Sequence, residues 1–303
     1  MLKESDFQEV VSLALAEDLS DGGDITTQAL VDSSLTVSAQ IVSREEGVVA
    51  GLEVARYVLA QVDPEISFQP LVEDGDRVAP GEPLADLEGR AGSLLTAERT
   101  ALNFLGRMSG VATATSRFVA AAVGTGAKIS DTRKTMPGMR PLDKYAVRMG
   151  GGVNHRFGLY DAVMIKDNHI AAVGDIARSV SAAKARVGPG TMIVVEVETL
   201  EQLAVILDTR ADRVLLDNMD LSTLRRAVEM VGGRFAIEAS GGVTLENVRE
   251  VAETGVDLIA VGWITHSASQ LDVALDFHPA HPPALDFHSP HPSALDSDPD
   301  SAR

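Results

Sequence analysis

The hydrophobic pattern in the first part of the chain predicts a small domain in which helices and short strands are mixed. Four apolar residues fall on one face of a helix near the N-terminus: Phe7, Val10, Val11 and Ala14. Three strand-like runs follow, separated by turn signals: residues 37–43, 66–72 and 83–87. A helical pattern then covers residues 93–123, and we expect a break near Ser109 and Gly110.

After residue 126 the pattern changes to short apolar runs that alternate with helical segments. The runs are residues 127–130, 162–165, 192–197, 213–216, 235–239 and 258–261. Apolar strands separated by helices predict a parallel sheet that is buried on both faces. A barrel and a doubly wound sheet both fit this pattern, and the positions of the polar residues favour the barrel.

Polar or small residues stand where these strands end: Lys166, Glu196, Asp217, Ser240 and Gly262. In α/β barrels the carboxyl ends of the strands line the active site, so we expect these residues to converge on one cavity. Ser240, Gly241 and Gly262 also offer backbone N–H groups that a phosphate can approach closely. The pattern therefore predicts a phosphate site at the last two strand ends.

The formal net charge of −18 opposes binding to nucleic acid and to anionic membrane surfaces. One segment has the opposite charge, since residues 128–166 contain eight basic and three acidic residues. A solvated helix face accounts for Lys144 and Arg148, but not for the basic pairs beside strands, 133–134 and 155–156. These pairs predict a site for a substrate with several carboxylates and phosphates.

The chain has no cysteine, which excludes disulfides, thiolate metal sites and cysteine nucleophiles. No apolar run approaches the length of a membrane span, and acidic residues precede the apolar stretch 10–16, where a signal peptide would be basic. We therefore expect a cytoplasmic protein with neither a nucleic-acid nor a membrane partner.

The last thirty residues repeat with a period of ten, seen as Ala-Leu-Asp at residues 274–276, 284–286 and 294–296. Their proline content predicts a low-complexity, disordered tail, and four of the seven histidines lie there without a framework to hold a metal. The chain then divides into a first domain, 1–112, a barrel domain, 113–272, and this tail, 273–303.

Seven motifs stand out in order along the chain: TAERTALN (96–103), DTRKT (131–135), GGVNHR (151–156), IKDNH (165–169), VEVE (195–198), LDN (216–218) and EASGG (238–242). Together they resemble the quinolinate phosphoribosyltransferase family, and the resemblance extends from about residue 4 to 276. It implies a small N-terminal α/β sandwich domain, an incomplete α/β barrel, and a homodimer whose active sites are shared between subunits.

The resemblance also implies transfer of phosphoribose from phosphoribosyl pyrophosphate to the pyridine nitrogen of quinolinate, with loss of carbon dioxide. The expected quinolinate ligands are Arg99, Arg133, His155 and Arg156, of which Arg99 reaches the site of the other subunit. The expected catalytic set at phosphoribosyl pyrophosphate is Lys134, Lys166, Glu196 and Asp217. The resemblance further implies a magnesium ion at the phosphates, held by Glu196 and Asp217 directly or through water or substrate. The expected ligands of the 5′-phosphate are Ser240, Gly241, Gly262 and His266.

Three other functions remain open at this point. Lys166 fits a Schiff-base aldolase on a barrel, although a small aldehyde needs fewer arginines. The hairpin-like first domain fits a noncatalytic carrier module, although no lysine occupies the hairpin tip. A related phosphoribosyltransferase would act on another pyridine or on a molybdenum-linked substrate.

Overall fold

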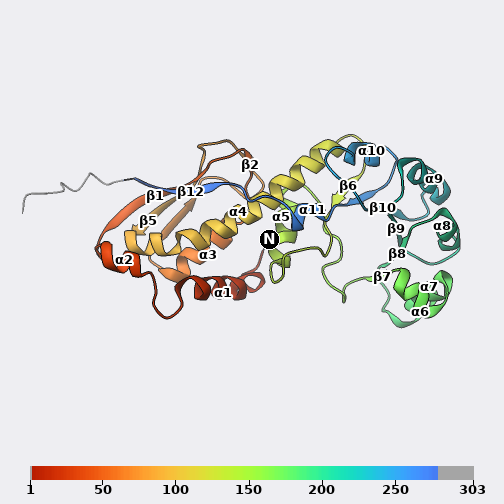
Figure 1. Ribbon diagram of the computed structural model, residues 1–303, viewed down its shortest axis with the longest axis horizontal. Helices are drawn as coiled ribbons and strands as arrows, with labels where there is room; N and C mark the ends of the chain where they lie inside the picture. The colour runs from red at the N-terminus through yellow and green to blue at the C-terminus, as the bar shows by residue number, and fades with distance from the viewer. Residues whose placement is uncertain (1, 279–303) are drawn as a thin grey trace, which may run out of the picture.

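The computed structural model describes residues 2–278 and shows two lobes joined by one long helix (Figure 1). The first lobe contains a four-stranded antiparallel sheet in the order β12-β1-β5-β3. Its strands are β1 (Thr36–Ser43), β3 (Ser67–Pro70), β5 (Pro83–Arg90) and β12 (Val273–His278), and a separate pair is β2 (Gly47–Val48) with β4 (Arg77–Val78). The helices of this lobe are η1 (Glu4–Asp6), α1 (Gln8–Leu19), α2 (Ile25–Leu30), α3 (Leu52–Val62) and the first part of α4 (Ala91–Ala122).

The second lobe is a six-stranded parallel sheet in the order β6-β11-β10-β9-β8-β7. Its strands are β6 (Lys128–Ser130), β7 (Val163–Ile165), β8 (Ile193–Val197), β9 (Arg213–Asp217), β10 (Ala236–Ser240) and β11 (Leu258–Ala260). Its helices are α5 (Arg140–Met149), α6 (Asp167–Val173), α7 (Ile176–Arg186), α8 (Leu200–Ile206), α9 (Leu221–Val231), α10 (Val248–Ala252) and α11 (Trp263–His266). Within the described residues β6 and β7 do not pair with each other, so the barrel is incomplete, as the sequence resemblance implies.

The barrel strands form where the sequence places consecutive apolar side chains. Val194, Val195, Val214 and Leu216 are fully buried, so β8 and β9 are covered on both faces, as expected for a parallel sheet between helices. Side chains of Thr199, Asp175 and Asp220 cap the N-termini of the helices that follow or precede these strands. Local capping and burial together place each strand end at the same rim of the sheet.

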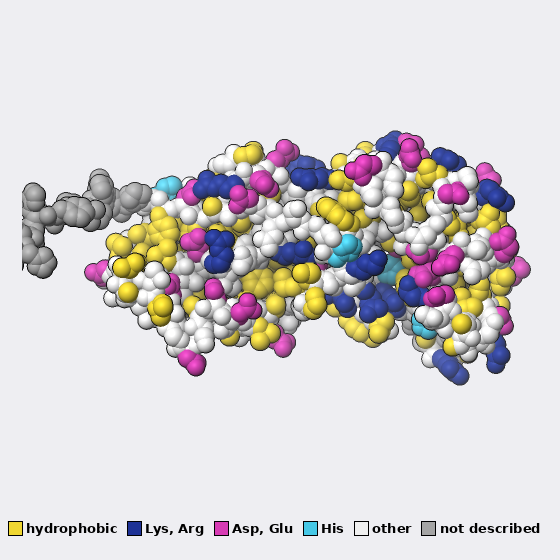
Figure 2. Space-filling model, viewed as in Figure 1, with side chains coloured by type: hydrophobic (Ala, Val, Ile, Leu, Met, Phe, Trp, Pro, Cys, Tyr) yellow, Lys and Arg dark blue, Asp and Glu magenta, His cyan; other side chains and the backbone are white. Residues whose placement is uncertain are grey.

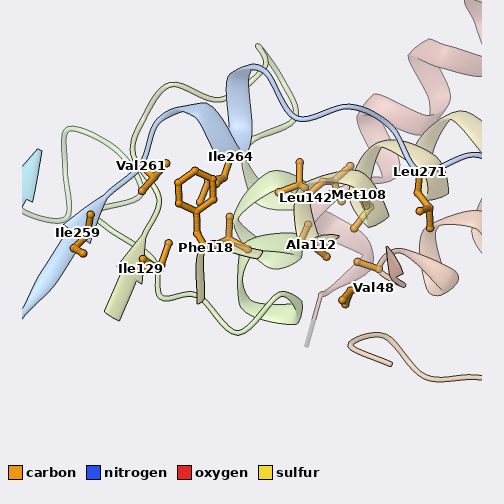
Figure 3. Packing of buried hydrophobic residues seen from close by; sticks show 14 of the residues in the cluster. Val48, Met108, Ala112, Phe118, Ile129, Leu142, Ile259, Val261, Ile264 and Leu271 are labelled. Atoms are coloured by element: carbon orange, nitrogen blue, oxygen red, sulfur yellow. The ribbon is translucent and has the colours of Figure 1, made fainter. Parts of the chain in front are cut away.

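Helix α4 connects the two lobes without interruption, so the break expected near Ser109 and Gly110 is wrong. A methyl group on Gly110 would lie 2.0 Å from the carbonyl oxygen of Ser269, and the Ser109 hydroxyl accepts a 3.0 Å hydrogen bond from the backbone N–H of Ala50. Small residues are needed here because other chain segments cross the helix closely. Figure 3 shows that apolar residues along α4 pack with both lobes, which share one hydrophobic cluster.

The end of the described chain corrects the domain division. Residues 273–278, which we expected in the tail, form β12 and pair antiparallel with β1, with Ile41 opposite Leu275. The apolar alternation of this segment lets it add an edge strand to the first sheet. The boundary at 112/113 also falls inside α4. The expected tail from residue 279 onward lies outside the described residues.

None of the helices within residues 2–278 is both long and apolar enough to cross a membrane.

Candidate active site

The carboxyl ends of the barrel strands surround a cavity of about 420 Å³. Its lining includes eight of the twelve expected site residues: Arg133, Lys134, His155, Arg156, Lys166, Glu196, Asp217 and Ser240. Figure 2 shows basic side chains and histidines gathered beside acidic ones in this region, between α11 and the barrel strands. Residues distant in sequence meet here because parallel strands all end at one rim.

Acidic and basic groups face each other on neighbouring strands of the cavity wall. The ammonium of Lys166, just after β7, donates a hydrogen bond to the carboxylate of Glu196 in β8. Asp217 ends β9 and accepts a 2.7 Å hydrogen bond from the side-chain amide of Asn218. The wall therefore offers oxygen acceptors for hydroxyl groups and a cation for phosphate.

The two arginines that line the cavity are arranged to receive an anion. Burial and the neighbouring positive charge of Arg133 lower the pKa of Arg156, although its guanidinium remains charged at neutral pH. The Arg156 side chain is oriented by a 3.2 Å hydrogen bond to the carbonyl oxygen of Ala162. Two like charges at one cavity repel each other, so a carboxylate bound between them would relieve an unfavourable interaction.

The loop that carries His155 and Arg156 is held by the buried carboxylate of Asp131. Its two oxygens accept hydrogen bonds from the backbone N–H of His155 at 2.8 Å and from the side-chain amide of Asn154 at 2.6 Å. Lys144 binds the same carboxylate and donates to the carbonyl oxygen of His155 at 3.1 Å. The cavity wall is thus fixed from beneath by one buried ion pair.

This geometry corrects the interpretation of Lys144 as part of a solvated helix face. Its side chain is 2% exposed and that of Asp131 is fully buried, whereas Arg148 on the same helix is exposed. Burial raises the pKa of Asp131 and lowers the pKa of Lys144, and the attraction between the two opposes both shifts. The helix α5 therefore turns one cation inward to support the loop.

His155 lines the cavity, but both of its ring nitrogens face the protein. Nδ1 accepts a 2.6 Å hydrogen bond from the backbone N–H of Arg156, and Nε2 lies 3.4 Å from a carboxylate oxygen of the buried Glu238. The structure thus places His155 beside the arginines, with its polar atoms directed away from the cavity.

Four expected site residues do not line the cavity: Arg99, Gly241, Gly262 and His266. Gly262 lies just outside it, where an added Cβ would come within 2.9 Å of Lys134 Cδ and 3.4 Å of the His266 ring. The backbone of Gly262 thus lies against the side chains of Lys134 and His266, and an added Cβ would require the flexible Lys134 side chain to shift. Gly241 has a φ of +93° and directly follows Ser240 at the rim.

Trp263, the residue after Gly262, does not fill this region. Its ring lies 6.2 Å from that of Phe118, measured between centroids, and it lines a separate cavity with Val243 and Leu245. Trp263 therefore does not obstruct the phosphate site predicted at Ser240 and Gly262.

Arg99 lies on α4 beside a second cavity of about 410 Å³, together with Asn103 and Arg107. Its side chain is 66% exposed. Within one chain the structure does not bring Arg99 to the other expected quinolinate ligands.

Four cavity residues were not predicted from the sequence: Thr132, Met164, Leu215 and Ala260. The last three each precede a strand-end residue by two positions, as Met164 precedes Lys166. Because strand side chains alternate between faces, this spacing was a signal that could have identified them.

The carboxylates of the cavity suit one kind of metal site. Among residues 2–278 no three His, Cys, Asp or Glu side chains form a group that could hold a metal ion. Mg²⁺ retains several water ligands and commonly binds through one or two carboxylates together with substrate phosphates. Glu196 and Asp217 therefore fit a magnesium ion that is held jointly with a phosphate-bearing substrate.

Two family models match the chain in order. Residues 24–109 match the N-terminal domain of quinolinate phosphoribosyl transferase, and residues 111–276 match the C-terminal domain. A carboxylating nicotinate-nucleotide pyrophosphorylase of Mycobacterium leprae is 47% identical over 284 residues, covering 91% of this chain and 100% of the relative. A chloroplastic relative from Arabidopsis thaliana is 41% identical over 288 residues, covering 89% and 82%.

The fold is also similar to solved structures of related proteins. The crystal structure of NadC from Streptococcus pyogenes has a TM-score of 0.88 and 38% identity, covering 92% of this chain and 99% of that one. The structure of a nicotinate-nucleotide pyrophosphorylase from Francisella tularensis has the same TM-score and identity, covering 92% and 98%.

Proposed function

This chain belongs to the quinolinate phosphoribosyl transferase family, and from that membership and the geometry of its cavity we infer that it transfers phosphoribose to quinolinate with loss of carbon dioxide. The donor is phosphoribosyl pyrophosphate, and the products are nicotinate mononucleotide, pyrophosphate and carbon dioxide. The enzyme is a pentosyltransferase of de novo NAD biosynthesis. The observation that carries this function is the placement of paired arginines together with lysines and two carboxylates in one cavity.

The arginine side of the cavity binds quinolinate. Arg133 and Arg156 are the two cations that receive its carboxylates, since guanidinium groups pair with carboxylates through two hydrogen bonds. Their mutual repulsion in the free enzyme is offset when the dicarboxylate binds. The pyridine nitrogen is then directed toward the anomeric carbon of the donor.

The carboxylates and lysines of the cavity bind phosphoribosyl pyrophosphate. Glu196 and Asp217 accept hydrogen bonds from the ribose hydroxyls and favour the positive charge that develops at the anomeric carbon as pyrophosphate leaves. Lys134 and Lys166 attract the phosphates. The strand-end backbone at Ser240 and Gly262 receives the 5′-phosphate, with Gly241 and His266 beside it.

The reaction needs little acid–base help from the protein. The nucleophile is a neutral pyridine nitrogen, so no general base has to remove a proton before attack. Ribosylation makes this nitrogen cationic, and it then accepts the electrons released as the adjacent carboxylate leaves as carbon dioxide. The main contribution of the enzyme is to hold the two substrates in line.

Magnesium is proposed as the cofactor. When bound, it neutralises negative charge on the leaving pyrophosphate. Glu196 and Asp217 are the residues that hold it, directly or through water or substrate.

The active unit is proposed to be a homodimer with shared sites. Support comes from Arg99, an expected quinolinate ligand whose side chain is exposed at a different cavity of its own chain. A twofold dimer can present this arginine to the main cavity of the other subunit. The similarity to a bacterial relative supports a cytoplasmic location, whereas the Arabidopsis relative is named as chloroplastic.

The Schiff-base aldolase alternative does not account for the paired arginines of the cavity, since a small aldehyde needs fewer cations.

The function is tested by mixing the purified protein with magnesium, phosphoribosyl pyrophosphate and quinolinate, and by following nicotinate mononucleotide with chromatography. Carbon dioxide and pyrophosphate should appear in equal amounts with it. A protein that makes no nicotinate mononucleotide under these conditions, with or without magnesium, would contradict the proposed function. Product formation without magnesium would overturn only the cofactor proposal.

A further inference from the structure

Glu238 is a fully buried carboxylate in the interior of the barrel. It lies in β10 two residues before Ser240, so both side chains point to the same face of the strand. Ser240 lines the cavity and Glu238 does not, which places the carboxylate one layer beneath the cavity. The interior of an α/β barrel is usually filled by branched apolar residues, and an ionised group there is costly unless it is paired.

The partners of Glu238 connect it to the substrate site. One carboxylate oxygen accepts a 3.1 Å hydrogen bond from Arg213 Nη1 and lies 3.4 Å from His155 Nε2. The side chains of His155 and Arg213 are 7% and 16% exposed. Three buried atoms of this group have no hydrogen-bond partner among the described residues: His155 Nε2, Arg213 Nε and Glu238 Oε1. Buried charged groups whose hydrogen bonds are incomplete contribute little to the stability of the fold. Packing alone therefore does not explain why a carboxylate is buried at position 238.

The tautomer of His155 follows from its two neighbours. Nδ1 accepts the backbone N–H of Arg156 at 2.6 Å, so the proton of a neutral ring is on Nε2. Nε2 lies 3.4 Å from a carboxylate oxygen of Glu238, an electrostatic contact without the geometry of a hydrogen bond. The ring therefore lies between the backbone N–H of Arg156 and the carboxylate of Glu238.

We propose that Glu238 is a positioning residue for the quinolinate clamp: through His155 it fixes the backbone at Arg156 and, with it, the guanidinium that receives a substrate carboxylate. The inference rests on the proposed function and extends it to a residue that does not line the cavity. Arg213 neutralises the carboxylate without reaching the cavity. Lys166 and Glu196 lie at β7 and β8, which carry no member of this group, so phosphoribosyl pyrophosphate binding should depend on Glu238 less than quinolinate binding does.

The test compares Glu238→Leu, Glu238→Gln and His155→Phe by steady-state kinetics. Glu238→Leu removes the acceptor, and the KM for quinolinate should rise about tenfold, within the range of coupling between neighbouring side chains. The KM for phosphoribosyl pyrophosphate should change by less than about twofold. Glu238→Gln retains an oxygen acceptor of similar shape and should restore most of the affinity for quinolinate.

A double-mutant cycle with His155→Phe separates positioning from general stability. If Glu238 acts through His155, combining His155→Phe with either Glu238 substitution should raise the quinolinate KM no further than His155→Phe alone. If Glu238→Leu does not fold, the cycle with Glu238→Gln still tests the inference. The smaller increase in quinolinate KM caused by Glu238→Gln should then disappear when His155→Phe is also present. Independent, multiplying effects, or equal changes in both KM values, would overturn the inference.

Asp63→Asn is the matched control, since Asp63 is a buried carboxylate paired with Arg90 in the first lobe. It should lower stability and leave both KM values unchanged. The wild-type enzyme is measured first. Absence of product there contradicts the proposed function, whereas normal wild-type activity with an unchanged quinolinate KM in the Glu238 variants overturns only the positioning role.

Discussion

The ammonium of Lys144 lies 2.5 Å from a carboxylate oxygen of Asp131, and the two side chains are 2% and 0% exposed. The pair joins α5 to the segment that follows β6, and it also binds the backbone of the loop at His155. A contact of this kind is sensitive to removal of either partner, because the remaining charge is buried without compensation.

Lys144→Met should therefore reduce the free energy of unfolding by about 3–5 kcal/mol. Urea denaturation followed by circular dichroism measures this loss. Lys184→Met is the matched control, since Lys184 pairs with Asp212 at the surface and its removal should cost less than about 1 kcal/mol. Combining Lys144→Met with Asp131→Asn should be less harmful than the sum of the two changes. Wild-type stability in Lys144→Met would show that the buried pair contributes little.

The arginine clamp predicts strong selection between pyridine substrates. Nicotinate has one carboxylate, so its binding leaves part of the cationic site unpaired, and its kcat/KM should be at least about 100-fold lower than that of quinolinate. Arg156→Lys keeps the charge but loses the two-pronged hydrogen bonding, and it should raise the KM for quinolinate. The same change at Arg178, exposed on α7, should have no effect. Comparable turnover of the two acids by the wild-type enzyme would refute the clamp.

Lys166 should act as a cation and form no covalent bond with substrate. Borohydride added with a carbonyl substrate should trap no adduct in the native enzyme, as judged by intact-protein mass spectrometry. Lys166→Arg retains the charge but changes its shape, so it should weaken the use of phosphoribosyl pyrophosphate. An adduct mapped to Lys166 would instead support the aldolase alternative.

Mixed dimers test whether Arg99 serves the neighbouring subunit. Arg99→Ala and Lys134→Ala homodimers should each be nearly inactive. After the two variants are unfolded and refolded together, half of the dimers should be mixed. Each mixed dimer should contain one intact site and one doubly altered site. Activity should recover to about a quarter of the wild-type value if pairing is random. If subunits exchange and the mixture stays as inactive as its parents, Arg99 serves its own subunit.

Asp63 predicts a defined pH dependence of stability in the first lobe. A hydrogen bond from the Ser93 hydroxyl, together with those from Glu65 N–H and Arg90, outweighs burial and lowers the pKa of Asp63 below 3.8. Its stabilising contribution is therefore complete above this unfolded-state value and is lost as the pH falls through the lower folded-state pKa. Urea midpoints of wild type and Asp63→Asn should differ at neutral pH and converge in acid. A constant difference would show that the carboxylate charge is unimportant.

The amino-acid pattern was sufficient to predict most of the barrel and the rim of its cavity. Apolar β-branched runs separated by capped helices specify buried parallel strands locally, and the alternation of side chains places the next polar residue at the carboxyl end. Lys166, Glu196, Asp217 and Ser240 therefore meet in one cavity, as expected from their positions after the strands.

Only the tertiary structure decided features that depend on contacts between distant segments. Gly110 looked like a helix break, yet it permits a close crossing by the chain at Ser269. Residues 273–278 resembled the repeats that follow them, but β1 offered an edge on which they could form a strand. In both cases the local sequence was compatible with two conformations, and packing against a distant segment selected one.

The same reason explains the charged residues beneath the site. The spacing of Lys144 and Arg148 on α5 suited a solvated face, and nothing in their local sequence distinguishes the buried cation from the exposed one. Lys144 is buried because Asp131, brought close by the barrel, compensates its charge. Glu238 lies inside the barrel beside Arg213 and His155 for a comparable reason. Sequence alone determined the strands and their polar ends, whereas charge pairing across the barrel depended on the folded chain, because burial is tolerated only where distant segments supply a partner.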